Sequence, residues 1–278
     1  GKITNNGVEF SINAIPVQNR NFTWQTTLNL SHNTNKVNRL SNEKYSTDSF
    51  RQGDPRVAGV SSEGWTQLIM EGQPLGTFYT YEFAGYNEKG VSTYYVHDAE
   101  TGERTGETTA SPAFKDRTIT GCAQPKLNLG WNNTFSYRNW SASFFFTGMF
   151  GQDVYNGMKA HYTAPDFFAG GKNVLKEFIT KRPATDTGSN IPSDKFIEDG
   201  SFLRLQSLTL GYTFRNLDGW VNSIQLYGTI NNVFTITGYD GLDPEVNMGG
   251  IDPGVDYRWN TYPHTRTFML GAKINFYL

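Results

Sequence analysis

Apolar and polar side chains alternate with a period of two along most of this chain, in segments of about ten residues. The clearest case begins with an arm that places one set of side chains on a single face: Leu127, Leu129, Trp131, Asn133, Phe135 and Tyr137. After a tight turn at 138–139, a second arm does the same with Trp140, Ala142, Phe144, Phe146 and Phe150. Such alternation is typical of β-strands with one apolar face, and helical periodicity is nearly absent. The pattern therefore predicts an all-β protein built from antiparallel hairpins.

The same alternation predicts further strands in residues 7–14, 22–31, 76–86, 201–214, 223–232 and 265–278. About nine long strands are expected by this criterion. One residue does not fit, because Arg204 falls on the face that carries Phe202 and Leu208.

The connections between these strands are strongly unequal in length. Short connections are expected at 15–20, 72–74, 138–139 and 215–221, and long polar ones at 32–64, 86–124, 151–199 and 236–263. A soluble β-sandwich would show the same alternation, but compact domains rarely contain several structureless loops longer than about 12–15 residues. Outer-membrane barrels have short periplasmic turns and long external loops. The loop pattern therefore favours an antiparallel transmembrane β-barrel.

The composition agrees with a membrane wall and excludes some partners. Aromatic residues make up 15% of the chain, with 20 Phe, 15 Tyr and 6 Trp, beside 29 Gly. Rings of this kind form girdles at the membrane interface of such barrels. The net charge is −2 and no basic run occurs, so a nucleic-acid partner is not expected. The single cysteine, Cys122, cannot form an internal disulfide.

Four long motifs occur in order, at 71–86, 121–156, 197–214 and 231–245, the last reading NNVFTITGYDGLDPE. Together they resemble the C-terminal part of the SusC/RagA-type TonB-dependent transporters of Bacteroidota outer membranes, and the resemblance covers nearly the whole chain. It implies a barrel of roughly 22 strands with a plugged lumen. Residues 1–278 would be its C-terminal part, without the plug domain and the N-terminal strands.

The resemblance also implies a function and its partners. Such a transporter imports oligosaccharides, or less often peptides, across the outer membrane of a Gram-negative bacterium. A SusD-like surface lipoprotein would cap the barrel, TonB would supply energy through the absent plug, and outer-membrane lipid would surround the wall. The alternative is an outer-membrane β-barrel hydrolase with a site at the external rim. That alternative requires a nucleophile with a nearby base, and the sequence shows neither.

The stretch 239–245 concentrates three carboxylates, Asp240, Asp243 and Glu245, among glycines and a proline. Their spacing does not match a calcium-binding EF-type loop. A glycosidase pair about 5–10 Å apart stays open, but we interpret these residues as turn formers. No catalytic, cofactor-binding or metal site is expected. Ligand contacts are expected from polar and aromatic side chains of the last long loop, namely Tyr239, Asp240, Tyr257 and Trp259.

Overall fold

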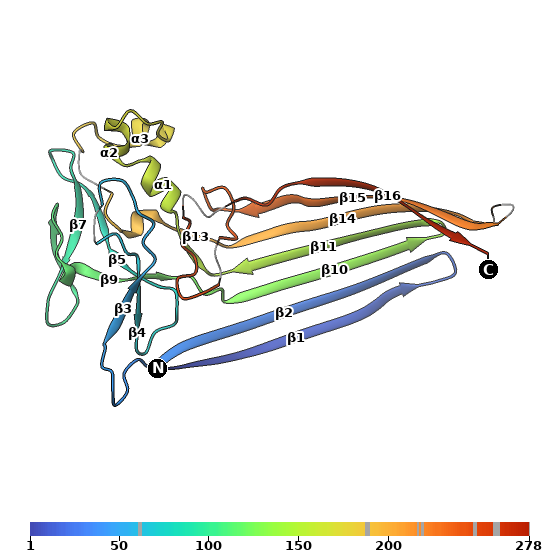
Figure 1. The fold of residues 1–278 in the computed structure, drawn as a ribbon, viewed down its shortest axis with the longest axis horizontal. Helices are drawn as coiled ribbons and strands as arrows, with labels where there is room; N and C mark the ends of the chain where they lie inside the picture. Colours follow the sequence, from blue (N-terminus) through green and yellow to red (C-terminus); the bar gives the residue numbers. More distant parts are fainter. Residues whose placement is uncertain are drawn as a thin grey trace.

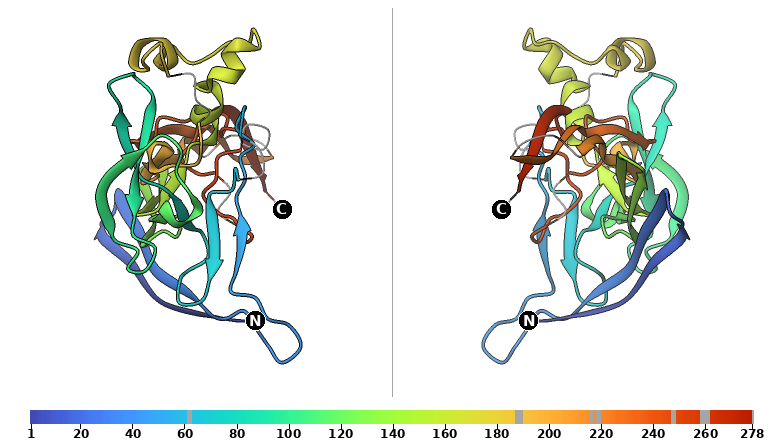
Figure 2. Two further views of the ribbon diagram at one scale, coloured as in Figure 1. Left: turned by 90° about the vertical axis from the view of Figure 1, so that its left-hand side faces the viewer. Right: turned by 90° about the vertical axis from the view of Figure 1, so that its right-hand side faces the viewer.

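The computed structural model describes residues 1–60, 63–186, 190–215, 217, 220–246, 249–257 and 262–277. They form two parts, a long sheet and a smaller head at one end of it (Figure 1). The sheet has seven strands in the order β1-β2-β10-β11-β14-β15-β16, each antiparallel to its neighbours. End-on views show that these strands lie on an open arc (Figure 2).

The strands of the long sheet are β1 (Lys2–Gln18), β2 (Phe22–Arg39), β10 (Leu127–Tyr137), β11 (Trp140–Phe150), β14 (Phe202–Arg215), β15 (Val221–Thr237) and β16 (Thr267–Phe276). The predicted hairpins are therefore confirmed. Several strands exceed the expected length, since β1 has 17 residues and β2 has 18. A membrane strand needs only about 9–11 residues, so these strands continue beyond the apolar region toward the head.

Residues 76–86 do not join the long sheet, so the expectation of about nine long strands is wrong for this segment. They form two short head strands, β5 (Thr77–Tyr81) and β6 (Phe83–Tyr86). The alternation is real, but Thr77, Phe78, Thr80 and Tyr81 are all buried, so both faces of β5 are covered. A strand with two buried faces belongs between packed layers, and periodicity alone does not distinguish it from a strand at a membrane.

The four long connections do not behave as independent loops, because they fold together into the head. Besides β5 and β6, the strands of the head are β3 (Ser49–Gln52), β4 (Gln67–Met70), β7 (Ser92–His97), β8 (Arg104–Thr109), β9 (Arg117–Cys122), β12 (Asp153–Tyr155) and β13 (Ile197–Asp199). Three short helices, α1 (Gly157–Tyr162), α2 (Pro165–Ala169) and α3 (Lys176–Lys181), and two 3-10 turns, η1 (Phe114–Asp116) and η2 (Asp194–Phe196), complete it.

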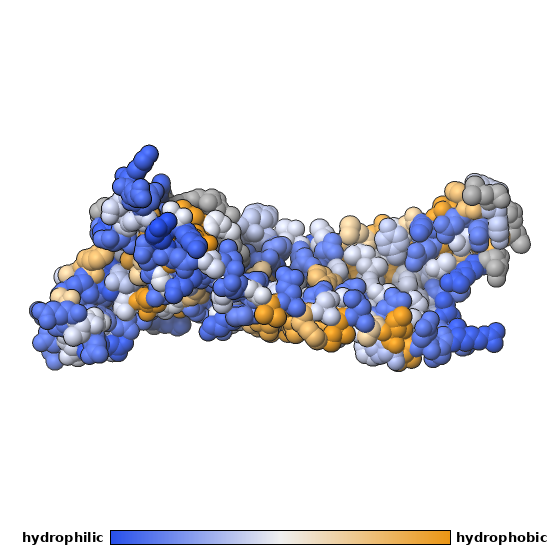
Figure 3. Space-filling model, turned by 90° about the horizontal axis from the view of Figure 1, so that it is seen from below, coloured by the Kyte–Doolittle hydropathy of each residue, from blue (hydrophilic) through white to orange (hydrophobic). Residues whose placement is uncertain are grey.

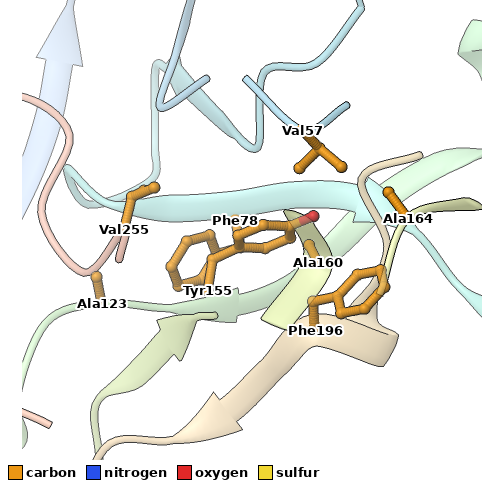
Figure 4. Close-up of a cluster of buried hydrophobic side chains, with 8 residues drawn as sticks. All are labelled: Val57, Phe78, Ala123, Tyr155, Ala160, Ala164, Phe196 and Val255. Carbon is orange, nitrogen blue, oxygen red and sulfur yellow. The ribbon is translucent and has the colours of Figure 1, made fainter. Parts of the chain in front are cut away.

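One buried cluster holds the head together, comprising Val57, Phe78, Ala123, Tyr155, Ala160, Ala164, Phe196 and Val255 (Figure 4). All four long connections contribute to it. Tyr155 is the bridge, since its N–H donates to Gly254 O and its C=O accepts from Asp256 N, each over 2.9 Å. The long connections therefore share one apolar core, which provides the burial that separate loops would lack.

The misfit of Arg204 is explained by irregular pairing between neighbouring strands. Phe144 and Phe146 of β11 pair with Leu208 and Leu205, so β14 contains one extra residue between these positions. Such a bulge reverses which side chains face each side of the strand. Leu205 therefore joins the apolar face, and Arg204 points to the other face with Phe202. On β15 the same level contains Asn232, which has a positive φ of 52°.

The long sheet has an apolar face and a polar face, because the strand pairing aligns residues of like polarity on neighbouring strands. One cross-strand row of the apolar face is Ile12, Leu28, Trp131, Phe146, Leu205 and Phe234. Apolar residues gather along the middle of the sheet, with hydrophilic residues toward both ends (Figure 3). Two indole N–H groups near this face find internal acceptors, Trp24 on Asn133 Oδ1 and Trp131 on Thr26 Oγ1, at 2.9 and 3.0 Å. Internal pairing of this kind is what a lipid environment demands.

In the described residues, no helix is long and apolar enough to cross a membrane.

Candidate ligand site in the head

A cavity of about 350 Å³ opens beside α1 and the start of the 238–257 segment. Its walls include Met158, Tyr162, Leu175 and Leu242, and charged groups Lys159, Lys176, Glu177 and Asp240 also line it. Ligand pockets of this size combine apolar walls with a few placed polar groups. The cavity is therefore the candidate ligand site of the head.

Lys159 is the electrostatic centre of this cavity. Its Nζ lies 3.0 Å from both Glu198 Oε1 and Asp240 Oδ2, and 3.6 Å from Glu177 Oε2. Helix α1 holds Lys159 in place, because the Asn156 side chain caps the helix by accepting the Lys159 N–H over 2.8 Å. Burial lowers the pKa of Lys159, but the hydrogen bonds to Asp240 and Glu198 outweigh burial and raise it above its ordinary value. The group is therefore a permanent cation surrounded by carboxylates.

Glu198 fixes the loop that carries Asp240. Its Oε2 accepts the Asp240 N–H over 2.8 Å, while its Oε1 accepts from Lys159 and from Asn156 Nδ2. Asp240 itself keeps a side chain that is 66% exposed. Of the predicted ligand-contacting residues, Asp240 is thus the one that the structure brings to the cavity with an accessible carboxylate.

Tyr239 has a different position, inside the head. It is buried against Val154 and Val246, and its hydroxyl donates to Asp256 Oδ2 over 2.5 Å. Burial and the adjacent Asp256 carboxylate raise its pKa, so the phenol remains a neutral donor. Here Tyr239 connects the two ends of the 238–257 segment.

Tyr257 and Trp259 complete the predicted set. The Tyr257 hydroxyl donates to Asp252 Oδ2 over 2.5 Å, and the ring packs at the edge of the head core. Trp259 lies outside the described residues. The structure therefore does not gather the four predicted contacts into one site.

The other two carboxylates of the stretch bind Arg204. Arg204 is fully buried; its Nη2 lies 2.5 Å from Asp243 Oδ1 and its Nη1 2.5 Å from Glu245 Oε2. Arg204 Nε also donates to Thr235 Oγ1 over 2.9 Å, and His264 Nδ1 lies 2.7 Å from Asp243 Oδ2. Interpreting Asp243 and Glu245 as turn formers is thus incomplete, since they also anchor the 238–257 segment to strand β14 of the long sheet. No group of three or more His, Cys, Asp or Glu side chains suited to a metal occurs in the described residues.

Sequence reasoning missed Lys159, Glu177 and Glu198. Lys159 lies in the connection 151–199, which was expected to be structureless, and Glu198 lies outside the motif that carries Asp240. A possible signal was the capped helix start at Asn156. A helix of six residues is too short to produce a periodic pattern.

The fold and the site together define a class of protein. A long antiparallel sheet with an apolar face, a polar face and the long connections folded at one end is the arrangement typical of the wall and external loops of outer-membrane β-barrels. Among solved structures, the chain is similar to the RagAB peptide transporter, with a TM-score of 0.71 and 21% identity, over 98% of this chain and 29% of that one.

Sequence comparison identifies the relatives of this chain more specifically than the fold does. It is 30% identical over 289 residues to TonB-dependent receptor SusC of Bacteroides thetaiotaomicron, covering 99% of this chain and 27% of that receptor. It is 29% identical over 303 residues to TonB-dependent receptor P3 of Formosa agariphila, covering 99% of this chain and 29% of the relative. No protein-family model matches. The resemblance to SusC/RagA-type TonB-dependent transporters is confirmed along the whole chain, which spans less than a third of the length of these relatives.

Proposed function

We propose that this chain is the C-terminal barrel portion of an active transporter in the outer membrane of a Gram-negative bacterium. The observation that carries the proposal is the contrast between the two faces of the long sheet. Rows of aliphatic and aromatic residues suit lipid on the apolar face, and hydrogen-bonding residues suit a solute passage on the polar face. The names of the relatives and the head at one end of the sheet support the same function.

The chemistry of the polar face favours a neutral, hydroxyl-rich solute, and we propose an oligosaccharide. One cross-strand row of this face is Asn13, Thr27, Asn132, Phe145, Ser207, Asn231 and Thr267. Amide and hydroxyl groups also bond across strands, as in Thr27 to Asn13 at 2.8 Å and Asn275 to Ser223 at 2.9 Å. Such groups both donate and accept, which matches sugar hydroxyls.

Charged residues on the polar face are few. The only ones in the described strands are Glu9, Arg204, Arg215 and Lys273, and Arg204 is already paired. A charged peptide would find little electrostatic complementarity along such a wall. The similar solved structure is that of a peptide transporter, RagAB, so the experiment must compare peptide with oligosaccharide as the substrate.

The head cavity supplies a first contact for the solute. The exposed carboxylate of Asp240 can accept sugar hydroxyls, and Tyr162 and Leu242 provide apolar wall for a ring face. Tyr257 and Trp259 belong to the same long loop, and we keep them as proposed contacts. Tyr239 then acts as a positioning residue, because it holds the loop from inside.

The partners follow the same proposal. A SusD-like lipoprotein would cover the head, and TonB would drive import through a plug contributed by another part of a longer chain. Strands β1 and β16 each have one neighbour in the described sheet. An unpaired strand edge is costly in lipid, so each edge is expected to pair with a further strand.

The test uses the full-length receptor in its host. Growth on an oligosaccharide should require both the receptor and TonB. Growth on an equivalent peptide mixture should not require the receptor. Asp240→Ala should slow oligosaccharide uptake severalfold, and Glu100→Ala, on an exposed head turn, should not. Uptake that survives loss of TonB would contradict the transport proposal. Hydrolysis of the oligosaccharide by the purified receptor would instead support the rim hydrolase.

A further inference from the structure

The apolar face of the long sheet carries only three charged side chains in the described strands, and all three are cations. They are Lys2 of β1 with Lys36 and Arg39 of β2, and we call them the basic patch. Register places them together, since Lys2 pairs with Arg39 and Thr4 pairs with Lys36. All three are exposed, at the end of the β1–β2 hairpin nearest the head.

Within the part of the chain that the structure describes, no carboxylate pairs with the basic patch. None of its three side chains forms an ion pair or a hydrogen bond with another described residue. Like charges placed directly opposite each other in a ladder are destabilising, and Lys2 faces Arg39 in this way. Lysine on an edge strand can discourage aggregation, but only Lys2 lies on the edge strand β1. The arrangement therefore points to an anion that neutralises the group.

The distance of the basic patch above the apolar band limits which kinds of anion can reach it. On β1 the highest exposed apolar residue of this face is Val8, and Thr4, the partner of Lys36, is four positions further along the strand. At about 3.4 Å per residue and a tilt of about 35–45°, Lys36 stands roughly 10 Å above the level of Val8. The headgroup zone of a phospholipid bilayer adds only about 5–8 Å on each side. The backbone of the basic patch therefore lies just above the zone of a simple phospholipid headgroup.

We propose that the basic patch binds the phosphorylated headgroup of a glycolipid in the outer leaflet, whose sugar core lifts its phosphates to this height. This inference rests on the proposed placement of the sheet in the outer membrane. Three basic groups around a phosphate give charge-assisted hydrogen bonds, and the apolar band below them accepts the acyl chains. The ligand would be a bound lipid of the wall, separate from the imported solute.

The experiment measures lipid retained by the full-length receptor in detergent, using native mass spectrometry. The probes are a rough lipopolysaccharide with a phosphorylated core, the same lipid after removal of its phosphates, phosphatidylglycerol and inorganic phosphate. The test variant combines Lys2→Gln, Lys36→Gln and Arg39→Gln. A matched variant combines Arg20→Gln, Arg138→Gln and Arg215→Gln near the short turns, with the same change in charge.

We expect the test variant to bind the phosphorylated glycolipid at least about tenfold more weakly, since each basic group near a lipid surface contributes severalfold. The matched variant should bind normally, and the dephosphorylated lipid should bind the unaltered receptor weakly. Equal binding by both variants, equal binding of phosphatidylglycerol, or competition by inorganic phosphate at similar concentration would each overturn the proposal. Cell fractionation tests the membrane placement separately: a receptor that reaches the outer membrane and imports solute, but ignores the glycolipid, refutes only this inference.

Discussion

Replacing Arg204 with methionine should detach the 238–257 segment from the wall. The guanidinium is fully buried and ties β14 to two carboxylates of that segment, Asp243 and Glu245. Methionine fills a similar volume but cannot donate a hydrogen bond. The change therefore leaves Asp243, whose side chain is only 7% exposed, without its main counter-charge.

The expected loss in the free energy of unfolding depends on which interactions each carboxylate retains after the substitution. Breaking a buried ion pair by removing one partner costs about 3–5 kcal/mol. Glu245 is 31% exposed and regains water. Asp243 retains hydrogen bonds from the backbone N–H groups of His264 and Glu245, each at 3.0 Å. We therefore expect a loss near the lower limit, about 3 kcal/mol in the free energy of unfolding.

The pKa of Asp243 gives the sign of the acid response. Burial alone would raise this pKa, but hydrogen bonds from His264 and Glu245 and the charge of Arg204 lower it below the ordinary value. Its stabilising contribution is then complete above the unfolded pKa of about 3.9 and is lost only as the pH falls through the lower folded value. The Asp243 contribution in the unaltered protein should thus stay constant from pH 5 to 8.

The assay is urea unfolding of the full-length receptor in detergent, followed by tryptophan fluorescence, together with the rate of proteolysis within 238–257. Arg215→Met is the matched control, because Arg215 is the exposed last residue of the same strand. Its cost should stay below about 0.5 kcal/mol. Adding Asp243→Leu to Arg204→Met should recover part of the loss, since it removes the stranded carboxylate. Equal costs for Arg204→Met and Arg215→Met would refute the reasoning.

Three further outcomes are expected from the head. Tyr239→Phe removes the hydroxyl donated to buried Asp256 and should cost about 1–2 kcal/mol in the same unfolding assay; an unchanged urea midpoint would contradict this. Glu198→Gln weakens the support of the loop and should speed hydrogen exchange in residues 238–246, whereas Asp240→Asn, at a mostly exposed carboxylate, should change that exchange little. Burial, then a neighbouring arginine, lowers the pKa of Lys195 to about 8. Because the unfolded chain binds more protons between pH 8 and about 10.5, stability should rise across that window, and Lys195→Met should remove the rise.

The wall could be read from the sequence because its two environments differ so much. Side chains at one parity are mostly apolar and those at the other mostly polar, as in the strands of a membrane barrel, so the alternation marks each strand directly. The bulge at Leu205–Ser207 interrupts this alternation. In the sequence, the bulge is indicated only by Arg204, a charged residue at an apolar parity. A charged residue on the wrong parity can signal a change of register as well as an error in the strand.

The head could not be predicted in the same way. Val57, Ala123 and Val255 come from three different long connections, and nothing in their own neighbourhoods indicates that they meet around Tyr155. Lys159 reaches Asp240 across 81 positions of sequence, through a helix too short to be periodic. Such contacts depend on tertiary packing, to which a local pattern is insensitive.

The distribution of charge gives the two parts different roles in the proposed transport. Among the described residues of the long sheet, few charges lie on the polar face, and the one buried cation, Arg204, is neutralised by Asp243 and Glu245 of the 238–257 segment. The head gathers cations and carboxylates around a cavity with an exposed Asp240. Electrostatic complementarity chiefly selects partners and speeds their encounter, so selection by charge belongs to the head. A wall of amides and hydroxyls can exchange hydrogen bonds with a neutral solute at many successive positions without holding it strongly at any of them. Weak binding at multiple sites is what passage requires, and it explains why a head rich in charged groups can stand beside a polar face that carries few of them.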